Sequence, residues 1–359
     1  MKKVISTNYV KKIVSSGLML FAAAGLMAQE EEDTTPKFTL SGSIDAYYRA
    51  NLNGDNSAPN GTPNAAPGSS FANLPGFALG MANVIAGYEG EKVGFVADLV
   101  FGPRGTDAVF GSPLYSATGN IVNQLYAYWN VSDAVTLTMG NFNTFLGYEV
   151  ISPTANFNYS TSYLFSYGPF SHTGIKADIA LNDDWSLMLG VMNPTDVTEL
   201  NTNGKYAYGA QLGYSGQYLN FITSEGTYEI DFTGGFDVSD SFFLGVNAAY
   251  FDGDGSGSFA GVALYPQLAA SEDFTIGLRG EYFSATDFYG NVAIGTPATI
   301  EDTSVFAVTL TGSYVIDNLT IKPELRLDSA SDDSAKFLDN DLMPQKSLSS
   351  FVLAAIYSF

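Results

Sequence analysis

The chain has 359 residues, with 37 acidic and 15 basic side chains and no cysteine. A net charge of −22 makes nucleic acid an unexpected partner, and the lack of cysteine excludes disulfides and a lipid anchor attached through cysteine. Tyrosine, phenylalanine and glycine are abundant, while only 14% of the residues are charged. This composition is unusual for a soluble domain and suits strands whose outer face is apolar.

The first residues predict export. Four lysines among the first 12 residues precede the apolar run Leu18–Met27, which leads to Ala28 and an acidic stretch. This order predicts a Sec signal peptide over residues 1–28 and a short acidic periplasmic lead over residues 29–37. Removing the signal leaves 11 basic and 37 acidic side chains, a net charge of −26. No other apolar run approaches the ~20 residues of a helical membrane span, so we do not expect a helical membrane protein.

The rest of the chain alternates apolar and polar residues with a period of two, in about sixteen segments near the ~10 residues of a tilted membrane strand. We expect the strands at Phe38–Arg49, Phe77–Tyr88, Lys92–Phe101, Ile121–Val131, Ala134–Phe142, His172–Leu181, Trp185–Met192, Lys205–Tyr214, Gln217–Ser224, Tyr228–Val238, Phe242–Phe251, Ser258–Ala269, Asp273–Phe283, Thr303–Val315, Leu319–Asp328 and Ser347–Phe359.

The connections between these strands are sorted by length. Links of two or three residues alternate with longer loops, and the short link Glu225–Gly226 is the main exception. In an up-and-down barrel, alternate connections lie on opposite rims. A soluble sandwich with crossed connections has no reason to sort its loops in this way. The sequence therefore predicts an all-β, transmembrane, up-and-down antiparallel β-barrel over residues 38–359, with short periplasmic turns and long extracellular loops.

The final strand ends in an aromatic row. Phe359, Tyr357, Leu353 and Phe351 share one face, while the other face carries smaller residues. An apolar row of this kind suits a strand that contacts lipid on one side. Phe359 and Tyr357 also resemble the C-terminal signal by which Gram-negative outer-membrane barrels are passed to their assembly machinery.

About sixteen strands enclose a lumen too wide for side chains to fill, so we expect a water-filled channel unless a loop obstructs it. Charges of both signs fall on the inward faces. They set a transverse field across the pore or form salt bridges in the wall, and both interpretations remain open. The predicted pore-lining residues are Asp45, Arg49, Asp98, Lys176, Asp178, Glu229, Asp231, Arg279, Glu281, Lys322, Glu324 and Arg326.

The long loop Asn143–Ser171 is the expected constriction. It contains eight tyrosines and phenylalanines but only one charge, Glu149, so burial in the lumen or against another subunit explains its composition better than exposure to water. We expect it to fold into the barrel. Glu149 would then face the basic wall residues, and rings such as Tyr148, Tyr159 and Tyr163 would offer flat apolar surfaces.

The segments Gly140–Glu149 (GNFNTFLGYE) and Asn156–Ser160 (NFNYS), followed by Pro169 and Thr173–Gly174, resemble the OmpL-like beta-barrel porins of Gram-negative outer membranes. The resemblance extends over essentially the whole mature chain. It implies a passive or weakly selective channel that contacts outer-membrane lipid and lipopolysaccharide and is assembled with periplasmic chaperones and the barrel-assembly machinery. Porins of this size often form homotrimers, so a homotrimer is a further expectation.

The sequence thus predicts a porin for small hydrophilic solutes with a mild cation preference, because its acidic excess favours cations. The alternatives are a substrate-specific channel, for example for saccharides, and a non-conducting barrel that acts as an adhesin or enzyme. A secreted soluble binding protein is a further alternative.

We expect no enzyme, cofactor or metal. A catalytic pair of Ser171 and His172 is not expected, because the two residues are adjacent on a strand and point to opposite faces. The segment Asp252–Gly257 begins like a calcium loop, but Ala263 occupies the position of its bidentate glutamate.

Overall fold

The computed structural model describes residues 37–57, 71–109, 121–201, 203–286, 303–331, 337–341 and 343–359. The predicted signal peptide, residues 1–28, lies outside these ranges, as does the acidic lead except for its last residue. The described part of the chain contains no helix that is long and apolar enough to cross a membrane.

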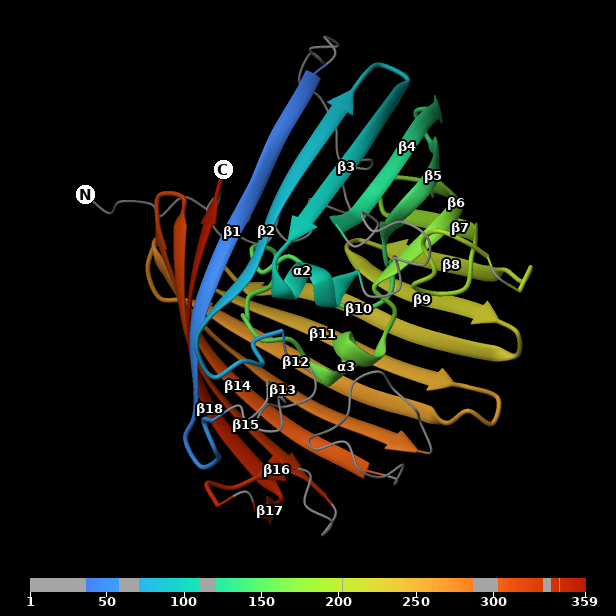
Figure 1. Ribbon diagram of the computed structural model, residues 1–359. Helices are drawn as coiled ribbons and strands as arrows, with labels where there is room; N and C mark the ends of the chain where they lie inside the picture. Colours follow the sequence, from blue (N-terminus) through green and yellow to red (C-terminus); the bar gives the residue numbers. More distant parts are fainter. Residues whose placement is uncertain are drawn as a thin grey trace.

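Sixteen strands form a closed antiparallel barrel in which each strand pairs with its neighbours in the chain (Figure 1). This confirms the expected fold class. The barrel strands are β1 (Lys37–Asn51), β2 (Gly76–Glu89), β3 (Val93–Phe101), β4 (Val122–Ser132), β5 (Val135–Asn143), β6 (Ser171–Ala180), β7 (Trp185–Met192), β8 (Ala207–Tyr214), β9 (Gln217–Ser224), β10 (Thr227–Ser239), β11 (Phe242–Asp252), β12 (Ser258–Ala269), β13 (Phe274–Thr286), β14 (Thr303–Ile316), β15 (Leu319–Ala330) and β18 (Ser347–Ser358).

The period of two in the sequence separates an outer from an inner face. On β18, Leu353, Ala355 and Tyr357 are exposed, whereas Val352 and Ile356 are buried. The exposed large apolar side chains of the other strands alternate in the same way with buried polar ones. Because successive side chains of a strand point to opposite sides, the exposed rows form one continuous apolar outer surface.

The first and last strands close the barrel. β1 pairs with β18 in a register that runs from Ser43 opposite Ser358 to Asn51 opposite Ser350. Beyond this register, Gly42 and Phe359 exchange two backbone hydrogen bonds of 3.1 and 3.0 Å. A Cβ atom on Gly42 would lie 2.8 Å from the Phe359 ring, so glycine allows the terminal ring to lie against β1.

The short connections lie together on one rim. Ser215 and Gly216 turn with φ of 47° and 85°, and Asp317 turns with φ of 50°, the left-handed conformations that tight hairpins between twisted strands require. The link between β9 and β10 is the short connection on the opposite rim, as expected from the sequence.

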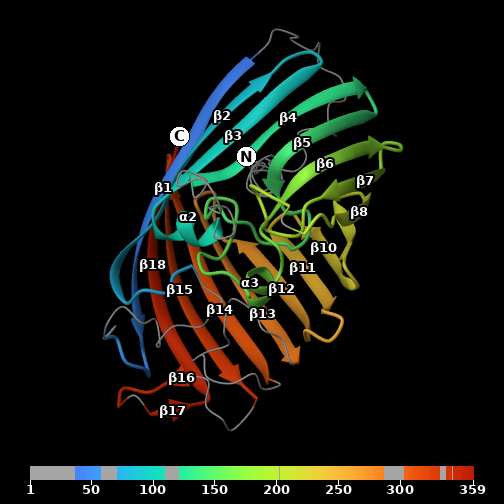
Figure 2. The same cartoon turned by 45° about the vertical axis from the view of Figure 1, so that its right-hand side comes forward.

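The described parts of the loops contain four short elements that the strand pattern did not predict. These are the helices α2 (Pro103–Ala108) and α3 (Tyr163–Tyr167) and the paired strands β16 (Phe337–Leu338) and β17 (Pro344–Gln345). Both helices lie inside the ring of strands in the two views of the barrel (Figures 1 and 2). The interior is therefore occupied by chain segments as well as by inward-facing side chains.

Candidate pore constriction

Residues 144–170 connect β5 to β6 and form the long loop. It includes α3 and lies inside the ring of strands (Figure 2). Nearly all of its residues are buried or half-buried, and Thr154 is the one exposed residue among them. The burial of the loop agrees with its composition, which includes a single charged residue among 27.

Aromatic and aliphatic side chains of the long loop pack against four parts of the wall. Tyr163 and Leu164 join a buried cluster with β12, β13 and β14. Phe165 packs with α2, β2 and β3, and Phe145 packs with β7, β8 and β9. Tyr159 packs with β1 and β18. The loop is therefore held by apolar contacts on nearly all sides of the barrel.

Two wall arginines bind the middle of the loop through its backbone. Arg279 on β13 donates to the carbonyl oxygens of Ser160 (2.6 Å) and Thr161 (3.1 Å). Arg326 on β15 donates to the Thr161 carbonyl at 2.8 Å. Because the backbone here forms no strand and is buried, these carbonyls need such donors to replace water.

Two further basic side chains bind the neighbouring part of the loop. Lys322 on β15 donates to the carbonyls of Pro153 (3.1 Å) and Asn156 (2.5 Å), and Arg104 on α2 donates to those of Ile151 (3.0 Å) and Tyr159 (3.1 Å). These four basic residues are thus bonded to peptide oxygens of the loop, and all four are buried.

Carboxylates of the wall accept hydrogen bonds from the backbone N–H groups of the loop, just as the basic residues donate to its carbonyls. Glu281 accepts from Tyr163 N (3.0 Å) and Leu164 N (2.8 Å), Glu324 accepts from Tyr159 N (2.9 Å) and Ser160 N (3.3 Å), and Asp231 accepts from Gly147 N (3.0 Å). Hydrogen bonds to charged acceptors are stronger than neutral ones. The wall therefore supplies the charges that the loop itself lacks.

Glu149 is the loop's own charge, and it is neutralised locally. Its Oε1 atom lies 2.6 Å from Arg279, and both side chains are almost fully buried at 3% and 0% exposure. Its other oxygen accepts from Ser162 N at 2.6 Å. The sequence predicted that Glu149 would face basic wall residues, and the structure identifies Arg279 as that residue.

The remaining predicted residues fall into two groups. Asp45 joins the loop site because the Tyr159 hydroxyl donates to it. Arg49 and Asp98 have partners on the wall: Arg49 donates to Asn51 at 2.6 Å, and Asp98 accepts from Asn123 at 2.6 Å. Lys176 and Asp178 form a wall pair at 2.8 Å, with 22% and 33% of their side chains exposed, and Glu229 is buried.

Three ion pairs among the described interior residues join charges that lie next to each other. Arg326 and Asp328 are bridged at 2.8 Å, in addition to the pairs of Glu149 with Arg279 and of Lys176 with Asp178. Of the two interpretations left open by the sequence, these contacts favour wall salt bridges over a field between separated charges.

The expectation that loop rings offer flat surfaces is wrong for Tyr159 and Tyr163, whose rings are fully buried. Tyr148 is half-buried and stacks on Tyr265 with 4.4 Å between ring centroids. Burial, with the neighbouring Asp45 carboxylate as a second cause, raises the pKa of Tyr159 above its usual value, so this phenol remains a hydrogen-bond donor. Contacts with the wall cover the ring surfaces that the loop composition had indicated as accessible to a solute.

Sequence reasoning missed two loop-binding residues. Arg104 lies in a loop that showed no strand pattern, where only its charge beside Pro103 stood out. Asp196, between β7 and β8, accepts from the amides of Phe170 and Ser171 at 2.8 Å each and so holds the end of the long loop. Burial raises its pKa to about 6. No periodic signal marks such positions.

Ser171 and His172 have partners other than each other. Thr144 Oγ1 lies 3.0 Å from His172 Nε2, and the ring of His172 packs on Phe145. Ser171 is engaged through its backbone with Asp196. Within the described ranges, no group of three or more His, Cys, Asp or Glu side chains is placed to hold a metal ion.

A closed barrel of 16 strands with an apolar outer face and a polar, loop-occupied interior is the architecture of an outer-membrane porin. The chain belongs to the family described as beta-barrel porin-2, OmpL-like, whose model matches residues 37–359. This confirms the family suggested by the sequence. No curated protein matches the chain significantly.

Solved structures with the same fold share little sequence with the chain. The outer membrane channel DcaP of Acinetobacter baumannii is 13% identical, with 93% of this chain and 100% of that chain covered and a TM-score of 0.56. An anion-selective porin from Comamonas acidovorans is 10% identical, with 90% and 100% covered and a TM-score of 0.57. The trimer form of OmpT from Vibrio cholerae is 11% identical, with 90% and 99% covered and a TM-score of 0.54.

Proposed function

We propose that the protein is a passive diffusion channel for small hydrophilic solutes in the outer membrane of a Gram-negative bacterium, with the long loop as its constriction. The family and the barrel support an outer-membrane channel. The observation that carries the constriction is the network of buried bonds from Arg279, Glu281 and Glu324 to the loop backbone. A loop fixed in this way narrows the lumen at a constant position.

A mild preference for cations is part of the proposal. The mature chain has 37 acidic and 11 basic side chains, and an acidic interior raises the local concentration of cations. The ion pair of Lys176 and Asp178 is partly exposed, whereas Arg279 and Glu149 are buried. We therefore expect accessible wall charges such as this pair to affect permeating ions most.

Single-channel conductance of the purified protein in planar bilayers, with reversal potentials under a salt gradient, tests the proposal. Stable openings with a small cation preference are expected. Asp178→Asn should shift the reversal potential toward anions and Lys176→Gln toward cations, because each leaves its partner's charge unpaired. Protein that inserts without conducting would contradict the channel function and favour a barrel adhesin or enzyme.

The burial of the loop rings argues against a saccharide channel in which sugars stack on the long loop. A saccharide channel was expected to use the rings of the long loop, but Tyr159 and Tyr163 are not exposed to a solute. Competition of sugars with ion current would nevertheless reveal a saccharide site elsewhere in the pore. Assembly as a homotrimer is a further proposal, and crosslinking of the protein in native membranes would test it.

A further inference from the structure

The long loop leaves one side of the inner wall partly exposed. On β15, Lys322 is the fourth residue from the tight-turn rim, is 4% exposed and donates to two loop carbonyls. On β6, Lys176 is the fifth residue from the same rim, yet 22% of its side chain is exposed. Its ion-pair partner, Asp178, and the ring that its amine faces, Phe142, both belong to the wall. At this depth the loop therefore covers Lys322 and leaves Lys176 accessible from the lumen.

Lys176 belongs to a polar patch on the inner face of three adjacent strands, β4, β5 and β6. The patch consists of two neighbouring rows of side chains, each joined by direct pairing across the strands. They are Tyr128, Thr138 and Lys176 in one row and Asn130, Thr136 and Asp178 in the row nearer the tight turns. We call these six residues the inner patch. They face the lumen, because Trp129, Met139 and Ile175, their neighbours in the chain, are exposed on the outer face.

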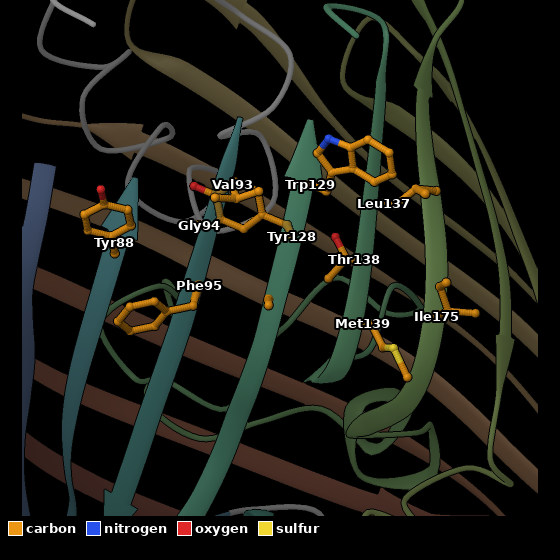
Figure 3. Close-up of a pocket in the computed structure, with 11 residues that line it drawn as sticks. Tyr88, Val93, Gly94, Phe95, Tyr128, Trp129, Leu137, Thr138, Met139 and Ile175 are labelled. Carbon is orange, nitrogen blue, oxygen red and sulfur yellow. The ribbon is translucent and has the colours of Figure 1, made fainter. Parts of the chain in front are cut away.

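Tyr128 places a flat ring at one edge of the inner patch. Figure 3 shows this ring extending from β4 toward β3, where Gly94 lies. A Cβ atom on Gly94 would collide with the ring, so the glycine allows the ring to lie against the wall. Because Tyr128 is half-buried, the part of the ring that the wall does not cover faces the lumen.

The rest of the inner patch offers hydrogen-bond donors and acceptors without a net charge. Lys176 and Asp178 form an ion pair at 2.8 Å, and Thr136 donates to Asn130 at 3.0 Å. All four side chains are half-buried, so they retain donors and acceptors that can bond to a solute. Because the two charges neutralise each other, the inner patch suits a neutral polar molecule better than an ion.

We propose that the inner patch binds neutral saccharides as they pass through the channel. An exposed aromatic ring beside several hydrogen-bonding groups suits a sugar, because its C–H groups pack on the ring while its hydroxyls bond to the polar side chains. The inference rests on the proposed channel function and names a class of solute for it. It places the sugar on the wall, since Tyr159 and Tyr163 of the long loop are buried.

Block of the single-channel ion current by sucrose tests the proposal. Sucrose should lower the current in a saturable way, whereas poly(ethylene glycol) of similar mass should not. Tyr128→Ala should raise the sucrose concentration for half block about fivefold, while Tyr128→Phe, which keeps the ring, should change it little. Tyr282→Ala is the matched control, because Tyr282 is 51% exposed on the outer face of β13.

A conducting wild-type protein that sucrose does not block would refute the inner patch as a sugar site and leave the channel function intact. Equal block of the wild type and of Tyr128→Ala would refute it as well.

Thiol labelling separates this inference from the channel function, because it requires no current. The chain has no cysteine, so Thr136→Cys adds a single thiol within the inner patch. Thr311→Cys adds one on β14, where Thr311 is buried and bonded to Asn158 of the long loop. A water-soluble maleimide should label Thr136→Cys, sucrose should slow this labelling, and Thr311→Cys should stay unlabelled. Labelling of Thr136→Cys at the same rate with and without sucrose would overturn the proposal, even for a protein that never conducts.

Discussion

Arg279 illustrates how single side chains position the long loop. Its guanidinium group contacts the Glu149 carboxylate, two loop carbonyls and the Thr309 hydroxyl, all within a fully buried environment. Desolvating two charges costs about as much as their attraction returns. The pair therefore contributes mainly by specifying where the loop lies, and its loss is costly because one charge remains buried alone.

We predict that Arg279→Gln lowers the free energy of unfolding by about 3 kcal/mol, the usual cost of breaking a buried pair. Urea unfolding of the barrel in detergent micelles measures the change. Lys205→Gln is the control, because Lys205 pairs with Glu225 at 3.6 Å on the surface and its loss should cost less than about 1 kcal/mol. Equal effects of the two substitutions would show that the buried pair does not hold the loop.

Asp196 makes the end of the loop sensitive to pH. Burial raises the pKa of its carboxyl from 3.8 to about 6, although two amides donate to it. Between these values the folded chain holds the proton more tightly than the unfolded chain does. The free energy of unfolding therefore falls as the pH rises through about 6.

Asp196→Asn keeps an oxygen acceptor and removes the charge, so we predict a variant more stable than the wild type at pH 8. The gain should be on the order of 1 kcal/mol, since the residue is half-buried and solvent screens its charge. It should vanish at pH 4. Urea unfolding at both pH values measures it. Asp254→Asn is the control, because Asp254 has a similar φ of 49° and is exposed. A gain independent of pH would contradict this explanation.

At this scale the sequence predicted which charges point inward but not what they bind. Side-chain direction follows from strand parity, a local property. The partner of Glu149 is 130 residues away, and the carbonyls bound by Arg104 belong to another loop. Such contacts depend on the path of an irregular segment, which no periodicity encodes.

Elements of the barrel could be predicted almost completely, because each strand repeats a two-residue pattern and ends at a turn signal. The bounds of β18, for example, agree with the expected strand to within one residue. The helix α3 was not predicted, since a five-residue helix is too short to show a period of 3.6. Its N-cap, Ser162, whose side chain accepts from Phe165 N, is the one local signal that could have indicated it.

The closing strand depends on its last residue. We predict that deleting Phe359 slows assembly of the barrel, because it removes two backbone bonds to Gly42 and the ring that covers β1. Heat-modifiable mobility on gels of outer-membrane fractions measures the folded amount. Phe359→Tyr, which retains the ring and backbone, is the control and should assemble normally. Normal surface assembly of the deletion variant would exclude Phe359 as an assembly signal.

The whole molecule combines a regular wall with an irregular interior, and the two are joined by complementary bonding. Where the wall and the long loop meet, the wall contributes nearly all the charged side chains, while the loop contributes peptide groups and aromatic rings. Buried clusters attach the loop to β1, β3, β7 and β13, among others. A loop attached on several sides does not swing aside as a hinged lid. The width of the pore beside it is therefore set by the length of the loop and by its side chains.

Shortening the loop should therefore widen the channel without opening the wall. We predict that replacing residues 150–166 by a short Gly-Ser linker raises single-channel conductance several-fold and weakens ion selectivity, because α3 and its contacts are removed while all sixteen barrel strands remain. Conductance and reversal potential in planar bilayers measure both effects. An equal replacement in the loop between β15 and β18, residues 331–346, is the control and should leave conductance nearly unchanged. An unchanged conductance after removal of 150–166 would mean that the narrowest passage lies at the wall itself, and the partly exposed pair of Lys176 and Asp178 would then be the first place to look for it.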